Sequence, residues 1–180
     1  MVLLLEGMNC AGKTTLAQRL YAELGWPIIK FNVPPDDAYD YFRDTLEEAR
    51  KTHSNLILDR GHLSNLAYNG CLGGGVIHFN QFDALDQSVD VLFLMVDDPF
   101  AIAERMKLRT GRNDGAEGLA RADIGRMQER FTQLYEHSRI PHKYSFTLRQ
   151  LIDERGETTA QLVNIIDKLR NGREFERIAR

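Results

Sequence analysis

Short apolar runs alternate along this chain with longer segments in which apolar side chains recur at helical spacing. The short runs predict strands, at residues 2–5, 27–31, 56–58, 89–96 and 143–148. The longer segments predict helices, at residues 14–24, 36–51, 63–68, 79–87 and 99–108, in a stretch ending near 137, and at residues 158–169. Strands that are apolar on both faces and alternate with helices are typical of a parallel sheet covered on both sides. The pattern therefore predicts an α/β fold in three layers, with a five-stranded parallel sheet between helices.

Prolines and glycines mark the boundaries of these elements. Gly25 follows the first helix, and two prolines end the second strand, after which Asp36 or Asp37 can cap the next helix. Pro99 opens a helix directly after the fourth strand. No linker, repeat or low-complexity tract divides the sequence, so residues 1–180 are expected to form one domain.

The composition narrows the class of protein. The chain has 180 residues, of which 43% are hydrophobic and 27% charged, and its formal net charge is −3. No overall basic field would therefore attract nucleic acid or a membrane. No apolar run reaches membrane-spanning length, and residues 1–5 are expected to form a buried strand rather than a signal peptide. Cys10 and Cys71 form no disulfide framework or ligand cluster, so a cytoplasmic protein is expected.

The residues after the first expected strand form a phosphate-binding motif. The segment Gly7–Thr14 has the pattern GxxxxGK[ST] and lies between an expected strand and an expected helix. Glycines let the backbone approach phosphates closely, and the N–H groups at a helix start supply positive partial charge. We expect Lys13 to bind the β- and γ-phosphates of ATP and the Thr14 hydroxyl to ligate Mg²⁺. The expected nucleotide-binding residues are Gly7, Asn9, Cys10, Ala11, Gly12, Lys13, Thr14 and Thr15.

Three segments of the chain match sequence motifs of a known enzyme family. They are EGMNCAGKTT at residues 6–15, LDRGHLSNLAYNG at residues 58–70 and VDVLFLMVDDPFAIAERMKLRTGRND at residues 89–114. Together they resemble thymidylate kinases and related deoxynucleotide kinases, in the family's order and over most of the chain. The resemblance implies a P-loop NTPase fold with a lid at about residues 105–118. The short chain is more similar to phage-type relatives of thymidylate kinase than to the housekeeping enzyme.

Asp59 and Arg60 end the third expected strand. Open α/β sheets bind ligands at the carboxyl ends of their strands, next to the phosphate loop in this case. Asp59 is a candidate to hold Mg²⁺ through water, or to accept a proton if the acceptor is a hydroxyl. Arg60 is a candidate to bind an acceptor phosphate with two hydrogen bonds. The alternative is a buried ion pair at a strand end, without a role in catalysis.

A group of arginines follows the helix expected at residues 99–108. Arg105 and Arg109 lie on one helix face, and Arg112 follows them after Gly111. Phosphoryl transfer spreads negative charge over the moving group, and the phosphate loop itself carries no arginine. We therefore expect Arg105 and Arg109 to be catalytic, with Arg105 also contacting the nucleotide. The alternative is a solvated basic helix end.

The acceptor region departs from the family pattern. Gly61 follows the Asp-Arg pair, where thymidylate kinases usually carry an aromatic residue or histidine, and Asn9 stands at a commonly acidic position of the loop. The stretch between the phosphate loop and the third strand is also short, and it normally carries much of the acceptor pocket. Phe42, Arg43 and Tyr68 are candidates for the remaining substrate contacts. The alternative for Phe42 and Arg43 is ordinary packing of an amphipathic helix.

These residues predict an ATP- and Mg²⁺-dependent kinase, and the resemblance implies that it converts a deoxynucleoside monophosphate to the diphosphate. A monophosphate acceptor is already an anion and requires no strong general base. A first alternative is a kinase for a hydroxyl acceptor, either a deoxynucleoside or a modified base within DNA. Gly61 would then make room for the substrate, and Asp59 would be the general base. A second alternative is a nucleotide-binding regulator without phosphoryl transfer, which the lid arginines disfavour. The resemblance is compatible with a homodimer.

Overall fold

The computed structural model describes residues 1–31, 36–68, 75–108, 121–151 and 157–178. Its centre is a five-stranded parallel sheet in the order β2-β3-β1-β4-β5. The strands are β1 (Val2–Gly7), β2 (Ile28–Lys30), β3 (Leu56–Asp59), β4 (Val91–Met95) and β5 (His142–Phe146). The fold predicted from the alternation of apolar runs and helical segments is therefore confirmed.

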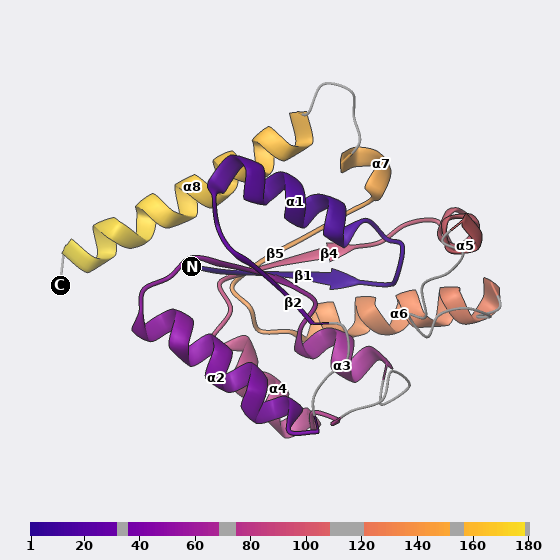
Figure 1. The fold of residues 1–180 in the computed structure, drawn as a ribbon, viewed down its shortest axis with the longest axis horizontal. Coiled ribbons are helices and arrows are strands. Elements are labelled where there is room, and N and C mark those ends of the chain that lie inside the picture. Colours follow the sequence, from indigo (N-terminus) through magenta and orange to yellow (C-terminus); the bar gives the residue numbers. More distant parts are fainter. Residues whose placement is uncertain (32–35, 69–74, 109–120, 152–156, 179–180) are drawn as a thin grey trace.

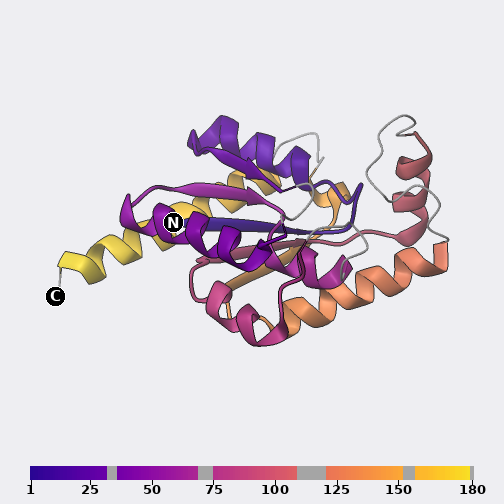
Figure 2. The ribbon, with the colours of Figure 1, turned by 60° about the horizontal axis from the view of Figure 1, so that its bottom comes forward.

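Helices cover both faces of this sheet (Figures 1 and 2). One face carries α1 (Lys13–Leu24) and α8 (Glu157–Ile178). The other face carries α2 (Ala38–Lys51), α3 (His62–Tyr68), α4 (Phe79–Asp86) and α6 (Arg121–His137). Beyond the carboxyl end of β1 lies α5 (Pro99–Leu108), and the short α7 (Leu148–Leu151) follows β5. Buried residues of β1 and β4 fill the core between the two layers, because both faces of a central parallel strand are covered.

Local signals in the sequence set the helix boundaries. Gly25 ends α1 in a left-handed conformation (φ 68°), where its N–H donates to the carbonyl of Tyr21 at 2.8 Å. Asp98 caps α5 through its carboxylate, which accepts the N–H groups of Phe100 at 2.9 Å and Ala101 at 3.1 Å. Pro99 therefore occupies the first helical position, where its missing N–H is harmless.

Several expected boundaries differ from those in the structure. The helix expected from residue 36 begins at Ala38, and Asp37 precedes it without a side-chain capping hydrogen bond. The fifth strand ends at Phe146, and Leu148, expected in the strand, begins α7. The last helix continues to Ile178, well past residue 169. The prediction ended too early because the later turns lack the apolar spacing on which it rested.

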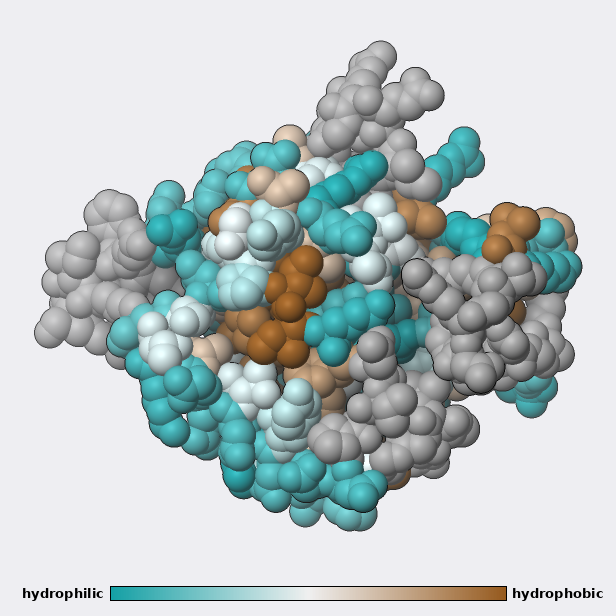
Figure 3. All heavy atoms as spheres, viewed as in Figure 1, coloured by the Kyte–Doolittle hydropathy of each residue, from teal (hydrophilic) through white to brown (hydrophobic). Residues whose placement is uncertain are grey.

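The surface in Figure 3 is mainly hydrophilic, with an apolar area at the centre of that face. A patch of this kind is common on folded proteins and does not by itself indicate a partner. Within the described residues, no helix is both long and apolar enough to cross a membrane.

Candidate functional site

The phosphate loop connects β1 to α1 at the carboxyl edge of the sheet. Strand β1 pairs with β3 on one side and β4 on the other, so the loop lies where the strand order reverses. Gly7 approaches β4 so closely that a Cβ atom would lie 2.3 Å from the carbonyl oxygen of Met95. Gly12 precedes the first residue of α1 with a φ of 104°. Both expected loop glycines are thus required by the backbone itself.

Lys13 is folded back onto its own loop. Its Nζ donates to the carbonyl oxygens of Gly7 at 2.7 Å and Met8 at 2.6 Å. Burial, followed by the positive charge of Arg60, lowers the pKa of Lys13 well below its usual range, although Asp59 and other neighbours oppose this shift. The amine is therefore held at the loop by two hydrogen bonds, while burial and the charge of Arg60 disfavour its charged form. A phosphate would supply the missing negative charge.

Thr14 and Asp59 meet across the first turn of α1 and the end of β3. The Thr14 hydroxyl donates to Asp59 Oδ2 at 2.8 Å. The second carboxylate oxygen, Oδ1, is buried and has no hydrogen-bond partner within the described structure. Buried carboxylate oxygens are costly unless they are paired or bound to a metal. A hydroxyl and a carboxylate at this spacing are oxygen ligands of the kind that Mg²⁺ binds.

Arg60 follows Asp59 in a left-handed conformation (φ 79°), and its backbone N–H donates to the Leu5 carbonyl at 3.0 Å. Its guanidinium carbon lies 5.4 Å from the centre of the Tyr68 ring. Guanidinium atom Nη1 is buried without a hydrogen-bond partner in the described residues. The Tyr68 hydroxyl in turn accepts the backbone N–H of Asn9 at 3.2 Å. Tyr68 therefore joins the phosphate loop to Arg60.

Gly61 does not open space for a substrate, contrary to the expectation from sequence. A Cβ atom at this position would lie 2.7 Å from Leu4 Cδ1 and 3.5 Å from Glu6 Oε1. The missing side chain thus faces the core below β1. A glycine is needed here because the turn packs directly on the central strand.

Phe42 and Arg43 lie on α2 with different surroundings. Phe42 is buried, with its ring centre 4.6 Å from that of Phe31, which follows β2 and donates its N–H to the Asp59 carbonyl at 3.2 Å. Arg43 pairs on its own helix with Asp40 at 2.6 Å and with Asp44 at 2.8 Å. Phe42 therefore lies in an aromatic cluster beside the end of β3, whereas Arg43 is engaged on the helix surface.

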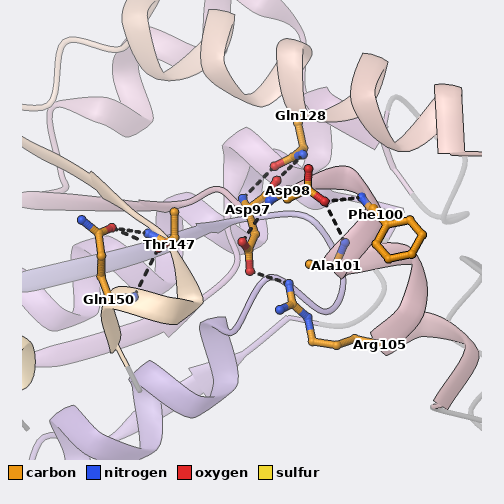
Figure 4. Close-up of polar contacts among 8 residues, drawn as sticks. All are labelled: Asp97, Asp98, Phe100, Ala101, Arg105, Gln128, Thr147 and Gln150. Atoms are coloured by element: carbon orange, nitrogen blue, oxygen red, sulfur yellow. Dashed lines mark hydrogen bonds and ion pairs between the residues drawn. The ribbon is translucent and has the colours of Figure 1, made fainter. Parts of the chain in front are cut away.

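Arg105 is held by Asp97, two residues after β4 (Figure 4). Arg105 Nη2 lies 2.6 Å from Asp97 Oδ2, and its Nε atom is buried without a partner in the described residues. Gln128 on α6 fixes the Asp97 backbone twice, accepting its N–H at 2.9 Å and donating to its carbonyl at 2.7 Å. Arg109, Arg112 and most of the expected lid lie outside the described residues.

The other expected loop residues differ in exposure. Asn9 and Ala11 are buried, Cys10 is half-buried with a φ of 62°, and Thr15 is exposed. Cys71 lies outside the described residues.

Among those described, no group of histidine, cysteine and carboxylate side chains could hold a metal ion on its own. A cavity of ≈ 440 Å³ lies at the opposite, amino-terminal edge of the sheet, lined by residues that include Val2, Asn55 and Asp90.

Sequence reasoning missed two sets of residues around this site. Glu6 is fully buried in β1 and accepts the N–H of Ser64 at 3.1 Å. A charged residue inside an otherwise apolar strand was the available signal, since such a group needs a partner. Thr147 and Gln150 form reciprocal hydrogen bonds of 2.7 and 3.2 Å at the start of α7 (Figure 4). Their Thr-x-x-Gln spacing is that of a capping box.

Comparisons with known proteins agree with this architecture. No protein-family model matches the sequence. Over 161 residues the chain is 27% identical to the SPbeta prophage-derived uncharacterized protein YorR of Bacillus subtilis (strain 168), a match that covers 83% of this chain and 90% of YorR.

Solved structures extend the comparison. The crystal structure of YorR in complex with phosphorylated GDP is similar with a TM-score of 0.74 at 21% identity, covering 93% of this chain and 96% of that one. Deoxyadenosine kinase from M. mycoides with bound dCTP gives a TM-score of 0.56 at 18% identity, covering 95% and 100%. The same enzyme with bound dATP gives 0.58 at 14% identity, covering 91% and 100%. The chain therefore has the three-layer α/β fold of P-loop kinases such as deoxyadenosine kinase.

Proposed function

We propose that this protein is an ATP- and Mg²⁺-dependent kinase that phosphorylates a deoxynucleoside monophosphate to the diphosphate, in the manner of a thymidylate kinase. One observation carries the proposal. The Thr14 hydroxyl contacts one oxygen of Asp59, and the other oxygen, Oδ1, and the Nη1 atom of the next residue, Arg60, are buried with no partner in the described structure. A carboxylate oxygen suits a divalent cation, and a guanidinium edge suits a phosphate. Both groups lie at the carboxyl edge of the sheet, beside a phosphate loop.

The donor side is the phosphate loop. The N–H groups at the start of α1 and the Lys13 amine would bind the ATP phosphates, and Lys13 would exchange its loop carbonyls for phosphate oxygens. Thr14 and Asp59 would hold Mg²⁺, the aspartate through water. When bound, the ion would neutralise charge on the phosphate oxygens. The unpartnered Asp59 oxygen fits this role because only an added cation or donor would satisfy it.

The acceptor side centres on Arg60. Its buried guanidinium atom without a partner would bind the acceptor phosphate, and Tyr68 would fix the guanidinium against the phosphate loop. Phe42 would border the base through the aromatic cluster at the end of β2, and Arg43 is the weakest of the proposed substrate contacts because its own helix already supplies its partners. An anionic acceptor needs no strong general base, which agrees with the lack of a histidine among these contacts.

Arg105 would supply positive charge to the transferred phosphoryl group, together with Arg109. Arg105 lies at the end of α5, beyond the carboxyl edge of the sheet, and Asp97 holds it there in this structure. Mobile guanidinium groups that reach the moving phosphoryl stabilise its spreading charge. We accordingly treat residues 1–180 as one kinase domain with a lid at about residues 105–118.

A hydroxyl acceptor is the second candidate. The unpartnered Asp59 oxygen that suits Mg²⁺ also suits a proton from a hydroxyl, and the fold is shared with deoxyadenosine kinase. DNA is a less favoured substrate, and a homodimer stays compatible with the proposal.

An ADP-release assay with ATP and Mg²⁺ separates these functions. Deoxynucleoside monophosphates, deoxynucleosides and single-stranded DNA serve as acceptors, with Lys13→Ala as the inactive control. Turnover is expected with at least one monophosphate. Turnover with hydroxyl acceptors alone would establish the second candidate, and nucleotide binding without any turnover would establish a regulator.

A further inference from the structure

Two buried carboxylates bind Ser64 and His62, which directly follow the turn that carries Arg60. Glu6, on the central strand, accepts the backbone N–H of Ser64 at 3.1 Å through Oε1, and its Oε2 accepts the Ser64 hydroxyl. Glu6 has no exposed surface, and burial raises its pKa, against the hydrogen bond from Ser64. A buried carboxylate is costly unless its oxygens are satisfied, and both oxygens of Glu6 accept hydrogen bonds from Ser64, which holds Ser64 to β1.

The second carboxylate is Asp86, at the end of α4. His62 Nε2 lies 2.7 Å from Asp86 Oδ1, and both side chains are buried. The other oxygen, Oδ2, accepts the backbone N–H of Arg139 at 2.6 Å, just after α6. Asp86 therefore joins α3, α4 and the end of α6. We name Glu6, Ser64, His62 and Asp86 the carboxylate clamp.

The clamp begins two residues after Arg60, whose backbone needs support. Arg60 has a φ of 79°, a conformation that residues with a Cβ rarely adopt and that persists only where the surroundings enforce it. Gly61 packs on Leu4 and Glu6 with no space for a side chain. His62 and Ser64, in the first turn of α3, hold the far side of this turn.

We propose that the carboxylate clamp positions Arg60 for the acceptor, so that His62, Ser64, Glu6 and Asp86 are positioning residues of the phosphoryl-transfer site. The inference rests on the proposed function, because it assigns Arg60 to the acceptor phosphate. The clamp's contacts at Ser64 and His62 hold the segment after β3, which carries Arg60, whereas in the proposed function the loop after β1 binds the ATP phosphates. Loss of the clamp therefore weakens acceptor binding more than ATP binding.

The test compares two substitutions at His62. His62→Phe fills the same space without a hydrogen-bond donor, whereas His62→Gln retains a nitrogen that can reach Asp86. We expect His62→Phe to raise the KM for the acceptor on the order of tenfold, as small displacements of positioning groups do, with little change in the KM for ATP. His62→Gln restores the acceptor KM toward the wild-type value. Ser64→Ala, which removes one donor to Glu6, is the milder second variant and shifts the acceptor KM in the same direction.

Asp90→Asn is the matched control for lost stability. Asp90 Oδ2 accepts the backbone N–H of Val2 at 2.7 Å, at the opposite edge of the sheet. Because asparagine loses the negative charge that lies 3.9 Å from the N-terminal amine, this variant is expected to lower Tm while leaving the KM for the acceptor unchanged. An equal rise in acceptor KM from Asp90→Asn, or equal changes in both KM values from His62→Phe, would overturn the positioning role.

Amide hydrogen exchange gives a readout that does not depend on activity. The Arg60 N–H, which donates to Leu5, should exchange faster in His62→Phe, while the Val2 N–H stays protected. If the Arg60 N–H is equally protected in His62→Phe and in the wild-type protein, the clamp does not position Arg60, whatever the kinetic measurements give. If the wild-type protein turns over no acceptor and His62→Phe still loses protection at Arg60 alone, the clamp stands and only the proposed function fails.

Discussion

Substitution of Gly12 by alanine tests how the phosphate loop is packed against the end of the sheet. Gly12 has a φ of 104°, and a Cβ atom there would lie 2.5 Å from Leu148 Cδ1 and 3.3 Å from Leu148 Cβ. Alanine thus meets two obstacles, an unfavourable backbone conformation and a steric overlap with α7. Gly25→Ala is the matched control, because Gly25 has a φ of 68° and nothing within 4 Å of its missing Cβ.

The magnitude follows from these two obstacles. A left-handed conformation costs an L-residue about 1–2 kcal/mol, which is the whole effect expected for Gly25→Ala. Overpacking adds about 1–3 kcal/mol at Gly12, where the neighbouring leucine is itself buried. Gly12→Ala should therefore lower the free energy of unfolding by about 2–5 kcal/mol, or Tm by about 5–15 °C for a domain of this size.

Differential scanning calorimetry of the single and double variants measures both parts. Leu148→Ala removes the overlap but not the backbone strain, so the Gly12→Ala and Leu148→Ala double variant should be more stable than additivity predicts, by about 1–2 kcal/mol. The stabilisation of Gly12→Ala by Mg·ATP should also be smaller, because the loop N–H groups move. If Gly12→Ala destabilises no more than Gly25→Ala, or if Leu148→Ala shows no coupling, then α7 does not pack on the phosphate loop.

Three further predictions concern charged and polar contacts of the site. Thr14→Val removes the 2.8 Å hydrogen bond to Asp59. Loss of this oxygen ligand should raise, by about tenfold, the Mg²⁺ concentration at which ATP stabilises the protein against heat. An unchanged Mg²⁺ requirement would exclude Thr14 as a ligand. Burial and the charge of Arg60 lower the pKa of Lys13, so above that lowered pKa the free protein lacks a proton that phosphate binding restores. ATP affinity should consequently fall as pH rises through this range, and titration calorimetry in buffers of different ionisation enthalpy should detect proton uptake that Lys13→Arg abolishes. Asp97→Asn releases Arg105 from a partly buried ion pair and should lower the free energy of unfolding by about 1 kcal/mol. If chemical denaturation gives the wild-type free energy of unfolding, the ion pair does not stabilise the fold.

The phosphate loop and the layer order could be predicted from sequence because their signals are local. A strand, a glycine-containing loop with a lysine and a helix follow one another directly in residues 2–24, and apolar periodicity identifies the remaining strands. The position of Asp59 and Arg60 followed from the same reasoning, since the end of a parallel strand beside the loop is a predictable location, and their roles stay a prediction.

The supports of the site could not be predicted, because their partners are distant in sequence. Glu6 meets Ser64 across 58 positions, and Asp97 is fixed by Gln128 across 31 positions. Gly61 illustrates the opposite error: its lack of a side chain suggested an open pocket, and only the packing shows that the space belongs to Leu4. At α7, the alternation of polar and apolar residues up to Leu148 outweighed the capping box of Thr147 and Gln150, which was present in the sequence.

Transfer of a labelled γ-phosphate from ATP to deoxynucleoside monophosphates, compared between the wild-type protein and Arg60→Gln, tests the proposed function most directly. The wild-type protein should form a labelled diphosphate. Arg60→Gln should raise the KM for the monophosphate about 10- to 100-fold, because hydrogen bonds to charged groups contribute about 1.5–3 kcal/mol, while ATP binding persists. Label that appears only on hydroxyl acceptors, or an acceptor KM that Arg60→Gln leaves unchanged, would contradict the assignment of this site.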